Sequence, residues 1–292
     1  MTAVADKPLH SYLVGNIEVH VVSDGEISTP LTDGMILNAS TDEVRRVLRA
    51  AALPDDRLTT TFAPILFRHE GRTVLIDTGL GPDFAAATGA TAGLLSRNMH
   101  TNGLNASDVD LVVVSHFHID HINGLLSRGE PVFPNAQIAA PEVEWRFWMD
   151  AAERSRAPEG SRTAQLFANA GRVFAPLRDR VRTYAPGEEI VSGLEAVATY
   201  GHSVGHMSFW LGSGSERVFV QSDLSNQAAL FVSNPHWQSP LDQFPEVAAR
   251  VRRQVYDRLA AERAPIQAFH HPFPGRCYLE KDGTGYRRIP IV

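Results

Sequence analysis

The stretch SHFHIDHING, residues 115–124, follows an apolar run and places three of the chain's 12 histidines within six residues. In an extended segment alternate side chains point the same way, so His116 and His118 can reach one point together. Asp120 and His121 follow the turn and can reach a second point nearby. Neutral imidazoles and a carboxylate suit zinc, and also iron or manganese. The stretch therefore predicts a metal site at the end of a buried strand, rather than a polar strand end with solvated histidines.

Two metal ions need more ligands than this stretch holds. Three further candidates each follow a predicted strand: His202 in TYGHSVGHMS, Asp223 in VFVQSD and His270 in IQAFHH. Sites in open α/β sheets lie beyond strand ends, so all three positions are reasonable. His270 and His271 are adjacent and point to opposite sides of a strand, so only one of them can bind the metal. The spacing to Pro272 favours His270.

Hydrophobic periodicity predicts a mixed α/β fold around these residues. Ile17, Val19 and Val21 alternate with polar residues, as in a half-buried strand, and residues 61–81 predict a hairpin with its turn near Gly71. Other predicted elements are a helix in residues 38–54 with a capping box of Ser40 and Glu43, a buried strand in 110–114, irregular helices in 141–175 and a long helix in 242–263. In the long helix, Phe244, Val247, Ala248, Val251, Val255 and Leu259 recur at helical spacing. We expect a two-sheet sandwich with helices outside.

Composition limits the class of protein. The chain has 292 residues, 43% of them hydrophobic, a net charge of −6 and a pI near 6.0. This acidic balance argues against nucleic-acid and anionic-membrane partners. The N-terminal residues lack the apolar core of a secretory signal, and no apolar run is long enough for a membrane helix. The lone Cys277 excludes an internal disulfide, so we expect a cytoplasmic location.

The ordered set HxHxDH, GHxxGH, strand-end Asp and late strand-end His resembles the metallo-β-lactamase superfamily. The early DTG at residues 77–79 matches as well, and HHPFPG at residues 270–275 resembles the methyl-parathion-hydrolase-like and lactonase branch. The resemblance implies a four-layer αββα sandwich that forms one hydrolase domain over residues 1–292, with 141–175 as a candidate helical lid insertion. The implied first-metal ligands are His116, His118 and His202, the second-metal ligands are Asp120, His121 and His270, and Asp223 bridges the two ions.

The implied reaction is hydrolysis by a hydroxide that bridges two divalent ions, with zinc preferred over iron or manganese. Asp120 would also orient the hydroxide, and Asp223 would fix the distance between the ions. The expected substrate is a small ester, foremost a lactone. Alternatives are phosphotriester or phosphodiester hydrolysis, β-lactam or thioester hydrolysis, iron-dependent oxygenation and an inactive metal-binding homologue. A homodimer is the default oligomer.

Several residues are candidates for support of the site or for the substrate pocket. Asp77 and His206 are expected to hydrogen-bond near the metal ligands. Phe117, Phe231 and Trp237 are candidate pocket walls, whereas Trp145, Phe147 and Trp148 are interpreted as core or lid packing. The chain departs from the family at Ser222, where many members have glycine before the aspartate. Because glycine shapes turns, we expect this change to affect local geometry more than ligation.

Overall fold

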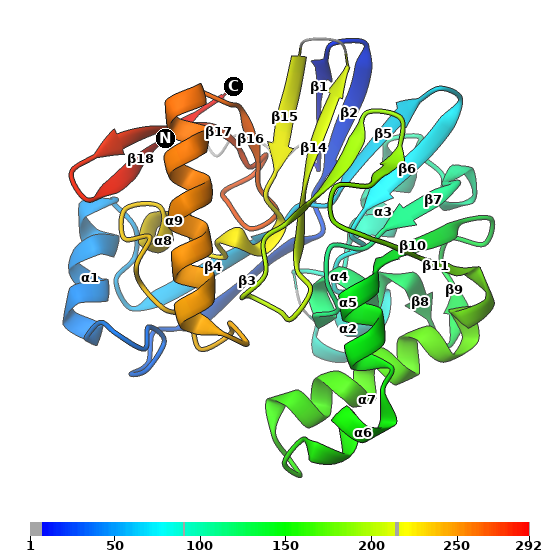
Figure 1. The fold of residues 1–292 in the computed structure, drawn as a ribbon, viewed down its shortest axis with the longest axis horizontal. Coiled ribbons are helices and arrows are strands. Elements are labelled where there is room, and N and C mark those ends of the chain that lie inside the picture. The colour runs from blue at the N-terminus through cyan, green and yellow to red at the C-terminus, as the bar shows by residue number, and fades with distance from the viewer. Residues whose placement is uncertain (1–7, 90, 214–215, 292) are drawn as a thin grey trace.

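Two seven-stranded sheets form the centre of the computed structural model, which describes residues 8–89, 91–213 and 216–291 (Figure 1). The first sheet has the order β1 (Leu9–Val14), β2 (Ile17–Val22), β5 (Ile65–His69), β6 (Arg72–Ile76), β7 (Leu111–Val113), β10 (Gln137–Pro141) and β11 (Val181–Tyr184). The second has the order β12 (Glu189–Val191), β13 (Leu194–Ala198), β14 (Met207–Ser213), β15 (Glu216–Val220), β16 (Ile266–Gln267), β17 (Arg276–Asp282) and β18 (Gly285–Pro290). The N-terminal residues 1–7, where no secretory signal was expected, lie outside the described residues.

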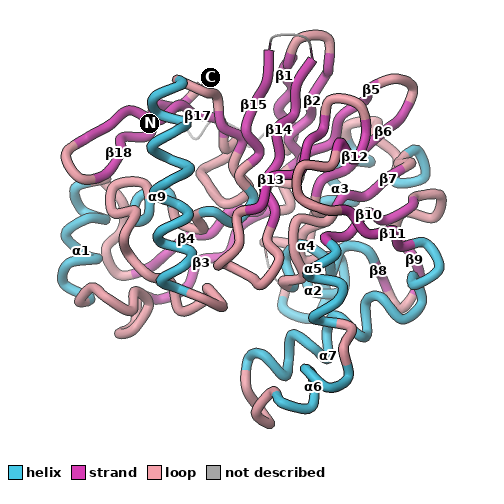
Figure 2. The backbone as a smooth tube through the Cα atoms, viewed as in Figure 1, coloured by secondary structure: helices cyan, strands magenta, loops and turns pink. Residues whose placement is uncertain are grey.

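The helices and two short hairpins surround these sheets (Figure 2). The helices are α1 (Thr41–Ala50), α2 (Pro82–Thr88), α3 (Leu95–Thr101), α4 (Ile119–Ile122), α5 (Glu142–Trp148), α6 (Ala151–Arg156), α7 (Arg162–Phe174), α8 (Ala228–Phe231) and α9 (Pro245–Glu262). The hairpins pair β3 (Gly25–Pro30) with β4 (Arg57–Phe62), and β8 (Leu126–Ser127) with β9 (Glu130–Pro131).

Three apolar clusters separate four layers. The central cluster joins the facing sides of both sheets, for example Val19 and Val113 of the first with Phe209 and Val218 of the second. A second cluster packs the outer face of the first sheet against α3, α5 and α7, and a third packs the second sheet against α9. The expected αββα sandwich is therefore confirmed, with α9 on one side and α3, α5 and α7 on the other (Figure 1).

Several predicted elements are confirmed in detail. In β2, Val19 and Val21 are buried whereas Glu18 is exposed, and β5 and β6 form the predicted hairpin. The capping box of α1 is present, since the Ser40 hydroxyl accepts from the Glu43 N–H and the Glu43 carboxylate accepts from the Ser40 N–H. β7 is buried on both faces and lies parallel to both of its neighbours, β6 and β10.

The long helix differs from its prediction at its start and on its buried face. α9 begins at Pro245, so Phe244 precedes it and is exposed, while Arg252 is fully buried. Helical periodicity sorts residues by polarity and therefore assigns arginine to the exposed side. The Arg252 guanidinium is buried because it donates to three backbone carbonyl groups, as described below.

The segment at residues 142–174 is helical, as expected, and its aromatic side chains pack together. Trp148 and Phe167 have ring centroids 4.7 Å apart, and both belong to the cluster beneath the first sheet. Phe117 joins this cluster and stacks on Phe174 at 4.5 Å, so its predicted place in the pocket wall is wrong. The cause is the alternation of side chains along the extended loop, since His116 and His118 face the metal site and the residue between them faces the opposite way.

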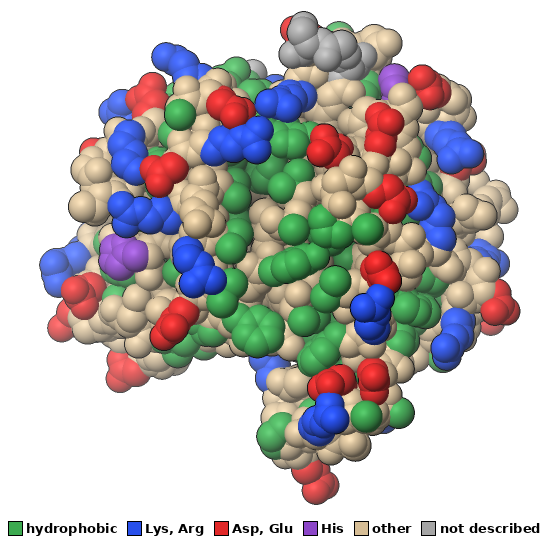
Figure 3. Space-filling view, in the orientation of Figure 1, with side chains coloured by type: hydrophobic (Ala, Val, Ile, Leu, Met, Phe, Trp, Pro, Cys, Tyr) green, Lys and Arg blue, Asp and Glu red, His purple; other side chains and the backbone are tan. Residues whose placement is uncertain are grey.

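The visible face of the molecule carries both signs of charge. Lys and Arg side chains alternate with Asp and Glu around a central apolar strip, and no single-sign patch forms on this face (Figure 3). None of the helices in the described part of the chain is long and apolar enough to span a membrane.

Candidate metal centre

Seven side chains from separate segments converge beyond the ends of the sheets. They form two groups in which the candidate ligand atoms all lie within 4.8 Å of one another. The first group is His116, His118 and His202, and the second is Asp120, His121, Asp223 and His270. The structure thus brings together every residue that the sequence nominated as a metal ligand, and it groups His270, not His271, with the others.

The three histidines of the first group point their ring nitrogens at one another. His118 Nδ1 lies 3.0 Å from His116 Nε2 and 2.8 Å from His202 Nε2. Burial, with positive charge nearby, holds the pKa of His116 and of His118 well below the ordinary value. Burial opposes charge on His202, but Asp223 and Asp242 raise its pKa to about 8. Neutral imidazoles are the form that binds metal, so His116 and His118 are already in the form that fits a divalent cation.

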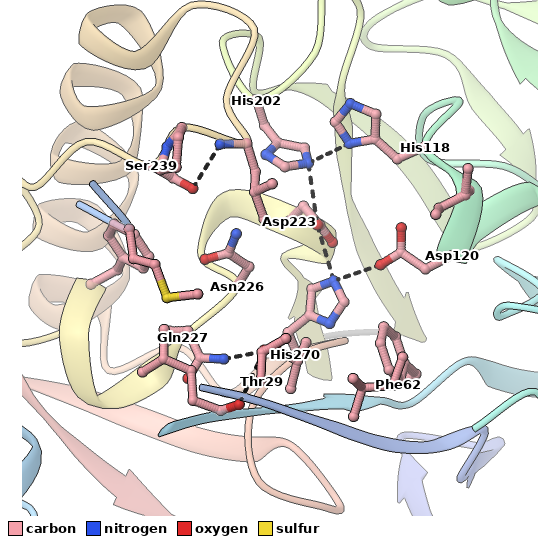
Figure 4. A pocket seen from close by; sticks show the side chains of 18 of the residues that line it. Thr29, Phe62, His118, Asp120, His202, Asp223, Asn226, Gln227, Ser239 and His270 are labelled. Atoms are coloured by element: carbon pink, nitrogen blue, oxygen red, sulfur yellow. Dashed lines mark hydrogen bonds and ion pairs between the residues drawn. The ribbon is translucent and has the colours of Figure 1, made fainter. Parts of the chain in front are cut away.

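Asp223 lies between the two groups (Figure 4). Its Oδ2 atom is 3.0 Å from His270 Nε2 in the second group and 3.2 Å from His202 Nε2 in the first. Its Oδ1 atom is 3.1 Å from His121 Nε2. Asp223 follows β15 in a short 3-10 turn, Ser222–Leu224, instead of ending the strand itself.

Two buried polar atoms, one on Asp223 and one on His121, lie where a bound cation would satisfy them. Within the described residues, His121 Nε2 and Asp223 Oδ1 are buried and lack a hydrogen-bond partner, although they face each other. A buried donor or acceptor without a partner is costly, and a shared metal ion would satisfy both atoms. The residues present therefore fit two divalent ions.

The second nitrogen of several histidines is held by an oxygen atom. His121 Nδ1 donates to Asp77 Oδ2 at 2.8 Å, His202 Nδ1 donates to Asp242 Oδ1 at 2.8 Å, and His270 Nδ1 donates to the Thr61 carbonyl at 2.8 Å. Such bonds fix the tautomer and turn each Nε2 lone pair toward the ligand position.

The turn at residues 77–79 supports the loop that carries HxHxDH. Asp77 accepts from the N–H and the hydroxyl of Ser115, and Thr78 donates to the His121 carbonyl through both its N–H and its hydroxyl. A Cβ on Gly124 would lie 1.9 Å from the Thr78 carbonyl oxygen, so only glycine permits this contact. The early DTG motif thus stabilises the ligand loop through these hydrogen bonds.

The carboxylates and histidines of the second group hold one another in charged form. Burial opposes charge on His270, but Asp223 and Asp120 raise its pKa to about 10. Burial likewise opposes charge on Asp223, yet His270, His121 and His202 hold its pKa well below the ordinary value. The carboxylates thus stabilise positive charge in this group, and cations placed there would take over the role of the histidine protons.

His206 and His271 lie beside the site and outside both groups. His206 Nδ1 lies 3.1 Å from the Thr199 carbonyl, and its Nε2 accepts from the Asp223 N–H at 3.0 Å. Burial and the charge of His202 lower the pKa of His206 to about 3, which suits a neutral acceptor. His271 Nε2 instead contacts Ser225 at 2.9 Å within a buried polar cluster.

A cavity of about 400 Å³ opens onto the metal centre. Five of the seven candidate ligands line it: His118, Asp120, His202, Asp223 and His270. The remaining wall is mainly apolar and includes Ile27, Met35, Leu58, Phe62, Leu230 and Phe231. Phe231 lines the cavity, whereas Trp237 is absent from the lining; both pack in the cluster around α1 and α8.

Several residues at this site were not predicted from the sequence. Asp242 holds His202, Glu144 holds the backbone of two ligand loops, and Arg162 and Asn226 line the cavity. These residues occur in no recognisable motif. Only their tertiary contacts reveal them.

Comparison with known proteins identifies the family to which this chain belongs. The family model of the metallo-beta-lactamase superfamily matches residues 64–235, which include six of the seven converging residues. The chain belongs to the metallo-β-lactamase superfamily. It is a metal-dependent hydrolase of this superfamily. A comparison with curated proteins returned no significant match.

Solved structures of the superfamily share the fold over nearly the full chain. One described as AidC, a dizinc quorum-quenching lactonase in complex with a product, is 22% identical with a TM-score of 0.90 and covers 98% of this chain and 99% of that chain. One described as hydrolase AbOPH in the beta lactamase superfamily is 23% identical, with a TM-score of 0.87 and 98% coverage of both. One described as N-acyl homoserine lactone hydrolase is 17% identical, with a TM-score of 0.60, and covers 88% of this chain and 98% of that chain.

Ser222, the departure from the superfamily noted in the sequence, adopts a backbone conformation that favours glycine. Its φ is +48°, in the left-handed region, and its buried hydroxyl has no hydrogen-bond partner among the described residues. We expect Ser222→Gly to raise the free energy of unfolding by about 1 kcal/mol, because it removes the backbone strain and the unpaired hydroxyl. Denaturant unfolding at matched metal content measures the change.

Ser225→Gly is the matched control, three residues along the same loop. Ser225 has an extended φ of −148°, and its hydroxyl lies 2.7 Å from the Tyr256 hydroxyl. This variant should lower stability instead. A loss of stability in both variants would show that Ser222 is not strained.

Proposed function

We propose that this metallo-β-lactamase-superfamily chain is a dinuclear zinc hydrolase that cleaves carboxylic esters, and lactones in particular. The observation that carries the proposal is the position of Asp223, within 3.2 Å of a histidine from each group. One carboxylate between two ligand groups suits a pair of ions that share a ligand. The apolar cavity that opens onto both groups supplies room for a substrate.

Each residue has a proposed role in this centre. The first ion is assigned to His116, His118 and His202, the second to Asp120, His121 and His270, and Asp223 to both. When bound, the two ions would lower the pKa of a shared water, supply it as a bridging hydroxide and polarise the substrate carbonyl. Asp120 lines the cavity, so its carboxylate can also accept a hydrogen bond from the attacking oxygen and direct it.

The cavity wall favours a substrate with an apolar portion. Solved relatives are described as a dizinc quorum-quenching lactonase and as an N-acyl homoserine lactone hydrolase with N-hexanoyl-L-homoserine bound at its catalytic metal centre. We therefore propose a lactone with an apolar substituent as the substrate class. The aliphatic and aromatic side chains around Leu230 and Phe231 would contact that substituent.

We also propose that the chain is one hydrolase domain and that residues 141–175 are a helical insertion at the cavity rim. Within the described part of this segment, Arg162 alone lines the cavity. Arg162 donates to the Leu241 carbonyl at 3.0 Å, which links the segment to the loop on the other side of the rim. This contact suits a rim element that limits access to the metal centre.

Metal analysis and a substrate panel test the proposed function. Purified chain should contain close to two divalent ions, and removal of the metal by a chelator should abolish ester hydrolysis, with recovery on addition of zinc. In a series of lactones, each added methylene should lower KM by up to about fourfold, because its burial contributes about 0.8 kcal/mol. An aryl phosphotriester and a β-lactam complete the panel.

The panel also separates the rival reactions. A kcat/KM for phosphotriesters that exceeds the value for every lactone would replace the proposed substrate class by phosphoryl transfer. Oxygen consumption with an iron-loaded chain would indicate redox chemistry instead. Full esterase activity in metal-free protein would refute the dinuclear centre itself.

A further inference from the structure

Glu144 is a fully buried carboxylate that no part of the proposed reaction uses. It lies in α5, and its side chain accepts four hydrogen bonds. Oε1 accepts from the Ser203 hydroxyl and the Gly205 N–H, both at 2.6 Å. Oε2 accepts from the Phe117 N–H at 2.9 Å and from Trp148 Nε1 at 2.8 Å. A buried carboxylate with this many donors is held in one position.

Three of the four donors belong to the two loops that carry the first ligand group, and the fourth, Trp148, lies on α5 itself. Phe117 lies between His116 and His118, and Ser203 directly follows His202. One oxygen of Glu144 therefore holds the HxH loop while the other holds the His202 loop. The approach is close, since a Cβ on Gly205 would lie 2.7 Å from the Glu144 backbone nitrogen.

Only a carboxylate satisfies this arrangement. The N–H groups of Phe117, Gly205 and Trp148 can donate but cannot accept. Glutamine in either side-chain orientation would place its NH₂ group against at least one of these N–H groups. The requirement for two acceptor oxygens thus distinguishes Glu144 from a residue that merely fills space.

We propose that Glu144 is a positioning residue that sets the spacing between the HxH loop and the His202 loop, and thereby the metal affinity of the first ligand group. The inference rests on the proposed dinuclear function. It predicts a selective effect, because the residues of the second group make no hydrogen bond to Glu144 among the described contacts. Residues that hold metal ligands contribute about 10–100-fold to metal affinity.

The test weakens one metal site at a time, so that the intact site dominates, and measures binding instead of activity. In His270→Ala the first group is intact, and in His118→Ala the second group is intact. Titration of the metal-free variants with Co²⁺, followed by its visible absorption and by chelator competition, gives one dissociation constant for each. We expect Glu144→Gln to weaken Co²⁺ binding about 10–100-fold in the His270→Ala background and less than about threefold in the His118→Ala background.

Controls distinguish positioning from general destabilisation. Glu142→Gln changes an exposed carboxylate on the same helix and should leave both constants unchanged. Equal weakening at both sites, or no weakening at the first, would overturn the proposal for Glu144 while the dinuclear function stands. Wild-type chain that binds no metal would overturn both.

A milder variant keeps the inference testable where Glu144→Gln does not fold. Ser203→Ala removes one of the four donors and no charge. It should weaken Co²⁺ binding several-fold in the His270→Ala background alone, and an unchanged constant there would overturn the proposal.

Discussion

Asp223→Ala is expected to lower kcat/KM for ester hydrolysis by about 10³-fold or more. The carboxylate contacts histidines of both groups, so its loss removes a ligand from each proposed metal site. Charge stabilisation by a bound metal contributes several kcal/mol to the transition state, and about 4 kcal/mol corresponds to about 10³-fold in rate. Steady-state kinetics beside metal analysis should show a parallel fall in activity and in ions per chain.

The reason for this large effect is that no neighbouring residue can replace Asp223. His206 accepts from the Asp223 N–H and lies outside both groups, so it offers no spare ligand in that position. Glu246→Ala, which removes an exposed carboxylate from the first turn of α9, is the control and should keep wild-type activity. An Asp223→Ala variant with two ions and wild-type kinetics would exclude Asp223 from the centre.

Residues of the site that carry a local signal, either a dense motif or a place after a predicted strand, were predictable, whereas the residues that support them were not. SHFHIDHING contains four of the seven converging residues, and the others follow predicted strands. Asp242 reaches His202 across 40 residues, and Glu144 reaches Phe117 across 27. No local pattern specifies such partners, because an isolated acidic residue in a sequence is usually solvated.

The same distinction applies to the fold. Alternation and capping residues predicted β2, the β5–β6 hairpin and α1, because these signals depend on neighbours along the chain. Phe117 was misplaced because its position depends on which side of the ligand loop faces the core. The buried face of α9 was only partly predicted, since the burial of Arg252 depends on carbonyl groups from loops outside the helix.

Arg252→Met is expected to lower the free energy of unfolding by about 3–5 kcal/mol. Its guanidinium donates to the carbonyl groups of Leu224, Pro235 and Trp237 and lies 3.4 Å from Asp242. Methionine fills a similar volume but leaves a buried carboxylate without its cation, the costly half of a broken buried ion pair. For a chain of this length the loss corresponds to about 5–8 °C in Tm. Arg253→Met, at the exposed neighbouring position, should change stability by less than about 0.5 kcal/mol.

A double-mutant cycle identifies the source of this loss. If the uncompensated charge of Asp242 causes much of it, Asp242→Asn should destabilise the Arg252→Met chain less than it destabilises the wild type. Asp242 also fixes the His202 ring through Nδ1, so Arg252→Met should weaken metal binding at the first group. Strict additivity of the two substitutions would contradict the coupling. It would mean that the three carbonyl contacts anchor α9 without a contribution from Asp242.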